Sequence, residues 1–158
     1  MAVLVVFCAL LSFADADFRQ DALNLHNQYR KKHNAPPLAL SEKVAQNWAQ
    51  NMANENRMYH SNGKYGENVF MSTDASLSDS EAATQATTAW YSEVSKYNFL
   101  LGGFSKSTGH FTQVVWKNSK YLGIGVARSS GRVYVCANYD PPGNYLNQFL
   151  QNVFKLLA

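Results

Sequence analysis

Two histidines and two glutamates are the side chains of this sequence best suited to carry out chemistry. His60 follows a helical pattern, Glu67 lies in a strand-like segment, Glu93 lies late in another helical pattern, and His110 follows a glycine. Two imidazoles and two carboxylates that converge on one cleft could hold a divalent ion or act as a proton-transfer pair. Because a single His or Glu is more often a surface or capping residue than part of a site, residue type and spacing alone do not establish such a cleft.

The segments around these four residues resemble the signatures of one protein family. Residues 109–116 (GHFTQVVW) resemble the first signature of the CAP superfamily, which joins cysteine-rich secretory proteins, insect-venom antigen 5 and plant pathogenesis-related proteins. Residues 134–145 (YVCANYDPPGNY) resemble the second signature, and residues 66–68 (GEN) and 90–93 (WYSE) resemble two shorter blocks. The resemblance runs in order from residue 18 to about residue 153 and so covers the domain that we assign to residues 17–158.

The resemblance implies both a fold and a site. The implied fold is α+β, a three-layer α-β-α sandwich with a small, mainly antiparallel central sheet. Matched position by position, the residues of the family's central cleft are His60, Glu67, Glu93 and His110. Several members bind zinc in this cleft, so the resemblance implies a zinc site with His60 and His110 as ligands and the two glutamates as supporting carboxylates. Neutral imidazoles are good zinc ligands, and nearby carboxylates can hold them in position.

An aromatic loop is the second feature that resembles the family. Residues 97–104 (YNFLLGGF) are similar to a loop that members use for sterols, with rings at Tyr97, Phe99 and Phe104. Flat rings on a glycine-containing loop can cover a flat sterol, and burial of each ring contributes ~2 kcal/mol. The alternative is that these rings attach the loop to the core, and the sequence leaves both interpretations open.

These features together predict a non-enzymatic extracellular protein that binds a sterol or fatty-acid-like ligand, in a defence, secretion or venom-like role. A hydrolase that uses the histidine–glutamate cleft is the first alternative, although neither Gly-x-Ser-x-Gly nor His-Glu-x-x-His occurs in the chain. A protein-interaction module is the second alternative. Monomer and weak homodimer both remain open.

The charge and the first residues bear on partners and location. The formal net charge is +3 and the fourteen Lys and Arg residues are scattered, which argues against a nucleic-acid partner and leaves a membrane surface open. An uncharged apolar run over residues 2–13 precedes Ala14-Asp15-Ala16, which predicts a signal peptide over residues 1–16, cleavage after Ala16 and secretion. The alternative is an apolar N-terminal helix or strand, and the run is too short to span a membrane.

The two cysteines predict a mature chain with one free thiol. Cleavage would remove Cys8 and leave Cys136 alone. The family's second signature usually has its cysteine one residue later, at the position of Ala137, and this offset turns the side chain to the opposite face of a strand. Cys136 is therefore predicted to be unpaired and to pack as a small apolar residue. The shortage of cysteine resembles the Golgi-associated intracellular branch of the family, whereas the leader resembles the secreted branch.

Hydrophobic periodicity predicts the elements that must position these residues. Helices are expected from the N-cap Asp17 to a stop at residues 34–37, from Ser41 to about Arg57, and from Ser78 to about residue 95. Ser78 and Glu81 form a capping box at the start of the third helix. Strands are expected at residues 65–71, 121–127 and 132–139, and the last two are joined as a hairpin.

Three tryptophans and two further histidines are predicted to have structural positions, and neither of these histidines matches a site of the family. Trp48, Trp90 and Trp116 lie on apolar faces and are predicted to be core residues. His26 and His33 belong to the first helix and its exit, and they are predicted to occupy solvated polar positions.

Overall fold

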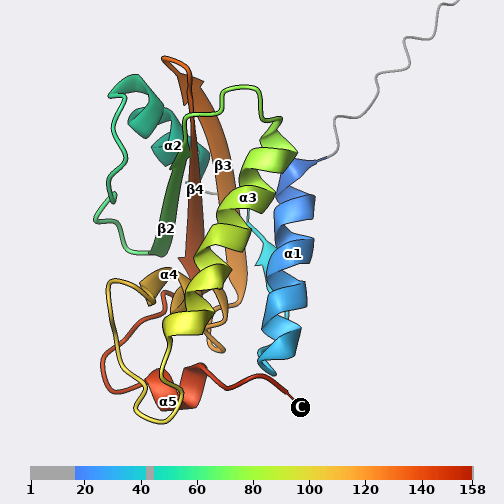
Figure 1. The fold of residues 1–158 in the computed structure, drawn as a ribbon, viewed down its shortest axis with the longest axis vertical. Coiled ribbons are helices and arrows are strands. Elements are labelled where there is room, and N and C mark those ends of the chain that lie inside the picture. Colours follow the sequence, from blue (N-terminus) through green and yellow to red (C-terminus); the bar gives the residue numbers. More distant parts are fainter. Residues whose placement is uncertain (1–16, 42–44, 158) are drawn as a thin grey trace, which may run out of the picture.

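The computed structural model describes residues 17–41 and 45–157, in which helices surround one small sheet (Figure 1). The helices are α1 (Phe18–Lys32), α2 (Ala45–Asn54), α3 (Asp79–Ser92), the 3-10 helix η1 (Glu93–Lys96), α4 (Gly109–Val114) and α5 (Phe149–Asn152). The strands are β1 (Ala39–Leu40), β2 (Gly66–Ser72), β3 (Tyr121–Ser129) and β4 (Arg132–Asp140). The predicted signal peptide, residues 1–16, and residues 42–44 of the predicted second helix lie outside the described residues.

The four strands form one sheet in the order β1-β3-β4-β2. Strands β3 and β4 form the predicted hairpin, and β2 runs antiparallel to β4 with Gly66 opposite Tyr139. Strand β1 is the exception, because it pairs with β3 in parallel. Helices α1 and α3 cover one face of the sheet and α2 covers the other (Figure 1). The prediction of an α-β-α sandwich with a mainly antiparallel sheet is therefore confirmed.

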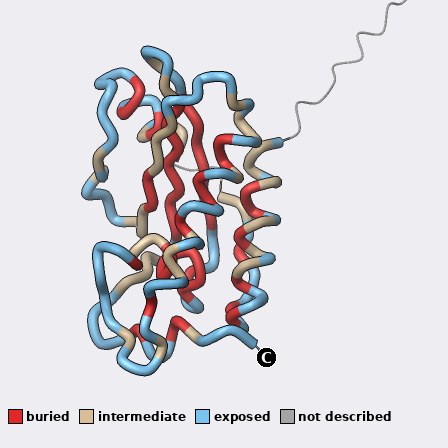
Figure 2. Tube along the Cα trace, in the orientation of Figure 1, coloured by how far each residue is buried: buried red, intermediate tan, exposed pale blue. Residues whose placement is uncertain are grey.

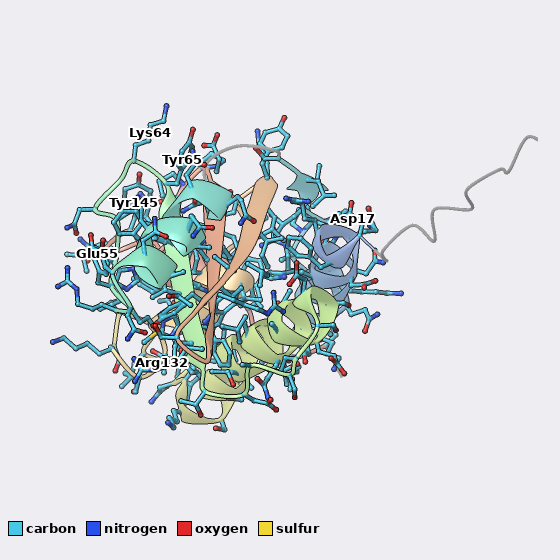
Figure 3. All side chains as sticks on the ribbon, turned by 90° about the horizontal axis from the view of Figure 1, so that it is seen from above. Asp17, Glu55, Lys64, Tyr65, Arg132 and Tyr145 are labelled. Carbon is cyan, nitrogen blue, oxygen red and sulfur yellow. The ribbon has the colours of Figure 1, made fainter. Side chains whose placement is uncertain are left out.

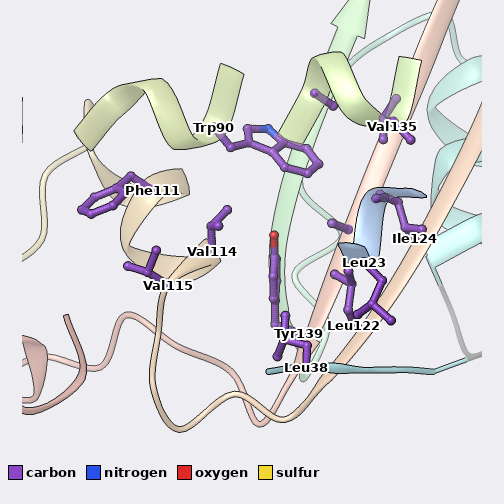
Figure 4. Packing of buried hydrophobic residues seen from close by; sticks show 14 of the residues in the cluster. Leu23, Leu38, Trp90, Phe111, Val114, Val115, Leu122, Ile124, Val135 and Tyr139 are labelled. Atoms are coloured by element: carbon purple, nitrogen blue, oxygen red, sulfur yellow. The ribbon is translucent and has the colours of Figure 1, made fainter. Parts of the chain in front are cut away.

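Strand β4 divides the hydrophobic core into two halves. Val135 and Tyr139 belong to the larger half, between the sheet and helices α1 and α3 (Figure 4). Tyr134 and Cys136 belong to the smaller half, between the sheet and α2. Successive side chains of a strand point to opposite faces, so Cys136 and Ala137 lie on different sides of the sheet. Cys136 is fully buried as an apolar residue and has no disulfide partner among the described residues.

Close contact between α2 and the sheet depends on a glycine and a glutamine. A Cβ atom added at Gly125 of β3 would lie 2.4 Å from Cα of Gln46, so a larger residue at this position would push α2 away from the sheet. The Gln46 side chain then bonds both backbone groups of Val126, with Nε2 donating to the carbonyl at 2.7 Å and Oε1 accepting from the amide at 3.1 Å. The helix that leads toward His60 is thereby fixed on the sheet.

The helix starts follow the predicted caps. Asp17 accepts a hydrogen bond from the Arg19 amide at the start of α1, and Ser78 with Glu81 forms the capping box of α3. The sequence patterns did not predict β1, α4 or α5. Each is short, and β1 is defined by its pairing with β3 instead of by a local pattern. None of the helices in the described part of the chain is long and apolar enough to cross a membrane.

The prediction that His26 and His33 are solvated is wrong, because both are fully buried. His26 Nδ1 bonds the carbonyl of Ala22 at 2.8 Å and His33 Nδ1 bonds the carbonyl of Phe154 at 2.6 Å, so these nitrogens carry the proton. The Nε2 atoms then accept hydrogen bonds from tyrosine hydroxyls. Burial lowers the pKa of His26 to about 4 and also lowers the pKa of His33. Two neutral, fully paired imidazoles can therefore be core residues.

Arg30 is a buried residue of α1 that the sequence patterns did not single out. Its guanidinium donates to the backbone carbonyls of Pro36, Val114, Trp116 and Ser119 at 2.8 to 3.0 Å. Burial lowers its pKa to about 10, which still leaves it protonated at neutral pH. Arg30 thus attaches the segment after α4 to the first helix.

The three tryptophans differ in burial. Trp90 and Trp116 are fully buried, as predicted. Trp48 is only partly buried, and its indole Nε1 donates to the Tyr59 carbonyl at 2.9 Å.

Candidate functional site

A cleft of about 580 Å³ opens at the edge of the sheet formed by β2. Tyr65, which lines it, lies on the same side of the molecule as Tyr145 and on the side away from Asp17 (Figure 3). The lining residues come from the segment before β2, from β2 itself, and from the segments around α4 and after β4: His60, Ser61, Asn62, Gly63, Tyr65, Glu67, Asn68, Phe104, Lys106, Gly109, His110 and Asn144. Three of the four predicted site residues therefore line one cleft, and Glu93 lies behind it in contact with His110.

The first histidine–glutamate pair joins the loop after α2 to strand β2. His60 Nδ1 lies 2.8 Å from Glu67 Oε1, and the same oxygen accepts a hydrogen bond from the Ser61 amide at 2.9 Å. The Glu67 side chain is 7% exposed and the His60 side chain 56% exposed. Glu67 Oε2 is buried and has no hydrogen-bond partner among the described residues. The carboxylate thus holds the histidine at the cleft while it remains largely buried.

Hydrogen bonds decide the charge state of this pair. Burial alone raises the pKa of Glu67, but the hydrogen bonds from His60 and Ser61 outweigh it, so the pKa of Glu67 lies below its ordinary value. The hydrogen bond to Glu67 raises the pKa of His60. At neutral pH the pair therefore holds an ionised carboxylate beside an imidazole that accepts a proton more readily than a free histidine.

The second pair joins the end of α3 to the start of α4. His110 Nδ1 lies 2.8 Å from Glu93 Oε1, and Glu93 Oε2 accepts from the amides of His110 and Phe111 at 3.0 and 3.1 Å. Burial raises the pKa of Glu93, but the hydrogen bonds from these donors outweigh it and the pKa lies below its ordinary value. Both oxygens of this carboxylate are therefore occupied in fixing the first turn of α4 and the ring of His110.

A buried polar network supports His110 from behind. Asn68 Nδ2 donates to the His110 carbonyl at 3.1 Å and to the Tyr139 hydroxyl at 3.2 Å. The Tyr139 hydroxyl lies 2.8 Å from His26 Nε2, and it donates there because His26 Nδ1 donates to the helix backbone. The Trp90 ring also stacks on the His110 ring, with centroids 6.4 Å apart. The sequence analysis gave no role to Tyr139, although it lies in the segment that resembles the second signature, and it predicted a solvated position for His26; Asn68 belongs to the short GEN block beside Glu67.

The segment after β4 closes the cleft against α4. Asn144 Oδ1 accepts from the Thr112 hydroxyl at 2.6 Å, and Asn144 Nδ2 donates to the Gly109 carbonyl at 2.9 Å. Gln113 Oε1 accepts from the Gly143 amide at 2.8 Å. These contacts join the segments that resemble the two long signatures, so the two motifs form one wall.

The rings of the aromatic loop are divided between the core and the cleft. Tyr97 is 9% exposed and Phe99 is partly buried, and both rings pack against Phe111. Phe99 also stacks on His33, with ring centroids 5.9 Å apart. Phe104 is 54% exposed and lines the cleft. The first two rings therefore attach the loop to the core, and Phe104 is the ring placed to meet a ligand.

The arrangement of the histidines suits a metal ion better than nucleophilic catalysis. Both Nδ1 atoms are bound to carboxylates, which leaves Nε2 of each ring as the nitrogen available to a ligand. No group of three or more His, Cys, Asp and Glu in the described part of the chain could hold a metal ion, so such a site would have two protein ligands and open positions. Ser61 accepts a hydrogen bond from the Gly63 amide, and none of the described serines bonds a cleft histidine.

Comparison with known proteins was made by sequence and by fold. A family model for the cysteine-rich secretory protein family (CAP) matches residues 23–139. The Golgi-associated plant pathogenesis-related protein 1 of Homo sapiens is 39% identical over 150 residues, which are 89% of this chain and 94% of that protein. The secreted protein RBT4 of Candida albicans is 37% identical over 140 residues, which are 84% of this chain and 37% of that protein.

A solved structure with the same fold carries zinc. The crystal structure of NaASP2 with Zn²⁺ superposes with a TM-score of 0.74 at 28% identity, and the match covers 91% of this chain and 88% of that one.

Proposed function

Because the chain belongs to the cysteine-rich secretory protein (CAP) family, we propose that it is a secreted, non-enzymatic binding protein with a zinc-binding cleft and a lipid ligand. The observation that carries this proposal is the pair of histidine–glutamate contacts, each 2.8 Å long, in which His60, Glu67 and His110 line one cleft and Glu93 supports His110 from behind. The zinc in the crystal structure of NaASP2 supports the same assignment.

His60 and His110 are the residues that would hold zinc, through their Nε2 atoms. Glu67 and Glu93 accept hydrogen bonds from the Nδ1 atoms, and this contact fixes the tautomer and increases the basicity of the ligating nitrogen. A bound zinc ion would supply positive charge that attracts an oxygen donor of a ligand in the cleft. Because only two protein ligands are offered, we expect modest affinity.

The lipid ligand is proposed to lie against the loop of residues 97–104. The exposed ring of Phe104 lines the same cleft as the two histidines, and Tyr97 and Phe99 hold the loop on the core. A sterol or fatty-acid-like molecule with a polar oxygen at one end could therefore pack its apolar part on Phe104 and direct the oxygen into the cleft.

Secretion is proposed from the apolar leader, and a family described as secretory supports it, as does the secreted relative from Candida albicans. The Golgi-associated relative is a similar protein with a different location in the cell.

Calorimetric titration of the full mature domain with zinc tests the central assignment. The parent should bind one zinc ion at about pH 7.5 and bind more weakly at about pH 5.5, because protonated imidazole cannot ligate. His60→Ala and His110→Ala should each lose most of the binding. Asn62→Gly is the matched control, since it removes a cleft side chain that makes no hydrogen bond and keeps the positive φ of 55° accessible. Equal zinc uptake by the parent and a double-histidine variant would refute the metal site.

A further inference from the structure

The end of the molecule that carries α5 exposes a group of leucines. Leu100 and Leu101 lie on the aromatic loop and are 89% and 78% exposed, Leu146 precedes α5 and is 74% exposed, and Leu150 lies on α5 and is 58% exposed. A Cβ added at Gly102 would lie 3.0 Å from Leu150 Cδ2, so the loop rests on α5. Figure 2 shows the same end as largely exposed. These four residues, the leucine patch, form an apolar surface of the kind that marks an interaction site.

Lysines predominate among the charged residues near the leucine patch. Residues 94–118 and 141–157, which carry the patch, contain four exposed lysines and no Asp or Glu: Lys96, Lys106, Lys117 and Lys155. Two acidic residues adjoin these segments, namely the exposed Asp140 and Glu93, whose carboxylate is bonded to His110. Five acidic residues lie at the opposite end, where α1 and α3 begin (Figure 1): Asp17, Asp21, Asp74, Asp79 and Glu81. Two of them, Asp17 and Asp79, are paired with Arg19 and Arg128. The end with the leucine patch therefore carries an excess of positive charge, which suits a partner of negative charge.

We propose that the leucine patch docks on the surface of a membrane that contains anionic lipids. The leucines project from a loop and a short helix, and none of them lines the cleft, so they suit shallow insertion at the level of the headgroups. The surrounding lysines would then meet the lipid phosphates. A second copy of the chain fits poorly, because a symmetric contact through this end would bring four lysines against four lysines. This surface goes beyond the proposed function and requires neither zinc nor a lipid in the cleft.

Sedimentation of the full mature domain with vesicles tests the proposal. The parent should bind vesicles of phosphatidylcholine with phosphatidylserine, should bind vesicles of phosphatidylcholine alone much more weakly, and should dissociate as salt is added.

Replacement of both Leu100 and Leu101 by Ser should weaken binding at least about tenfold, because two apolar side chains no longer insert. Lys96→Glu combined with Lys155→Glu should weaken binding to the anionic vesicles only, because both lysines are exposed and neither lines the cleft. Met58→Ser is the matched control, since Met58 is 48% exposed but lies between α2 and β2.

Each outcome decides between the alternatives. Absence of binding to anionic vesicles, or equal binding by the parent and the Leu100 and Leu101 variant, would overturn the proposal. Self-association in sedimentation velocity that the leucine variant abolishes, without vesicle binding, would identify a second copy as the occupant instead. The zinc titration of the same variants separates this proposal from the function of the cleft, because the leucine variant should bind zinc like the parent. A parent that binds vesicles but no zinc would refute the metal site alone.

Discussion

Acid should destabilise the fold through His26, beginning at a higher pH than that at which carboxylates titrate. His26 is fully buried, and its two ring nitrogens are occupied by the Ala22 carbonyl and the Tyr139 hydroxyl. A second proton on the ring would remove the acceptor that the Tyr139 hydroxyl needs and place a charge in the core. Burial accordingly lowers the pKa of His26 to about 4.

The magnitude follows from the difference between the folded and unfolded pKa values of this residue. The ordinary pKa of 6.5 applies to the unfolded chain and about 4 to the folded chain, and each pH unit corresponds to about 1.4 kcal/mol, so the difference amounts to about 3 kcal/mol. Between these values only the unfolded chain takes up the proton. The contribution of His26 to stability is therefore complete above pH 6.5, declines as the pH falls toward about 4, and changes no further below that value. A loss of this size is a large part of the 5 to 15 kcal/mol typical of a domain.

Urea unfolding at a series of pH values, followed by tryptophan fluorescence, measures this loss. His26→Gln replaces the ring by an amide that can donate and accept hydrogen bonds but does not titrate, and the difference between the pH curves of the two proteins isolates His26. The lowered pKa of His33 acts in the same direction, and the raised pKa of His60 acts in the opposite one, but both are common to parent and variant and cancel.

Parallel pH curves for the parent and the variant would refute the reasoning. If the variant does not fold, proton NMR of the parent still decides the question, because a His26 ring that titrates near pH 6.5 in the folded protein contradicts the argument.

Three further predictions concern processing, the thiol and the lipid ligand. N-terminal sequencing of the natural product should begin at Asp17, and a product that retains Met1 would contradict a cleaved leader. Cys136 is fully buried, and burial raises the pKa of its thiol. A thiol reagent should therefore find one thiol per mature chain after denaturation and none before it. A covalent dimer on a non-reducing gel would contradict this prediction. Phe104→Ala should weaken binding of labelled cholesterol with little change in stability, because the ring is 54% exposed. Phe99→Ala should mainly destabilise the domain, because its ring packs on the core. Unchanged cholesterol binding in the Phe104 variant would place the lipid elsewhere.

The parts of the fold that the sequence predicted are those with strong local patterns. The amphipathic faces of α1 and α3 repeat at 3.6 residues and the strands of the β3–β4 hairpin at 2, and Asp17 and the Ser78–Glu81 capping box mark where the two helices begin. The structure places these elements within a few residues of the expected bounds. Strand β1 has no such signal, because two residues become a strand only through pairing with β3. His26 and His33 were misplaced for a related reason: a polar residue in a helix resembles a solvated one until its distant partners, Tyr139 and Tyr91, are known.

The contacts of the two glutamates explain how a cleft assembled from loops can hold two histidines in place. Glu67 binds one imidazole and the amide of the next residue, and Glu93 binds one imidazole and two successive amides at the start of α4. Each carboxylate therefore orders backbone and side chain together, and both oxygens of Glu93 are occupied in doing so. The contacts that hold the two histidines are unequal. Glu93 uses both oxygens, and Asn68 also bonds the His110 carbonyl. On the other side, one oxygen of Glu67 has no partner among the described residues, and the side chain of His60 is 56% exposed. His110 is thus the more firmly held histidine of the cleft, and His60 is the one with fewer supporting contacts and more exposure to solvent.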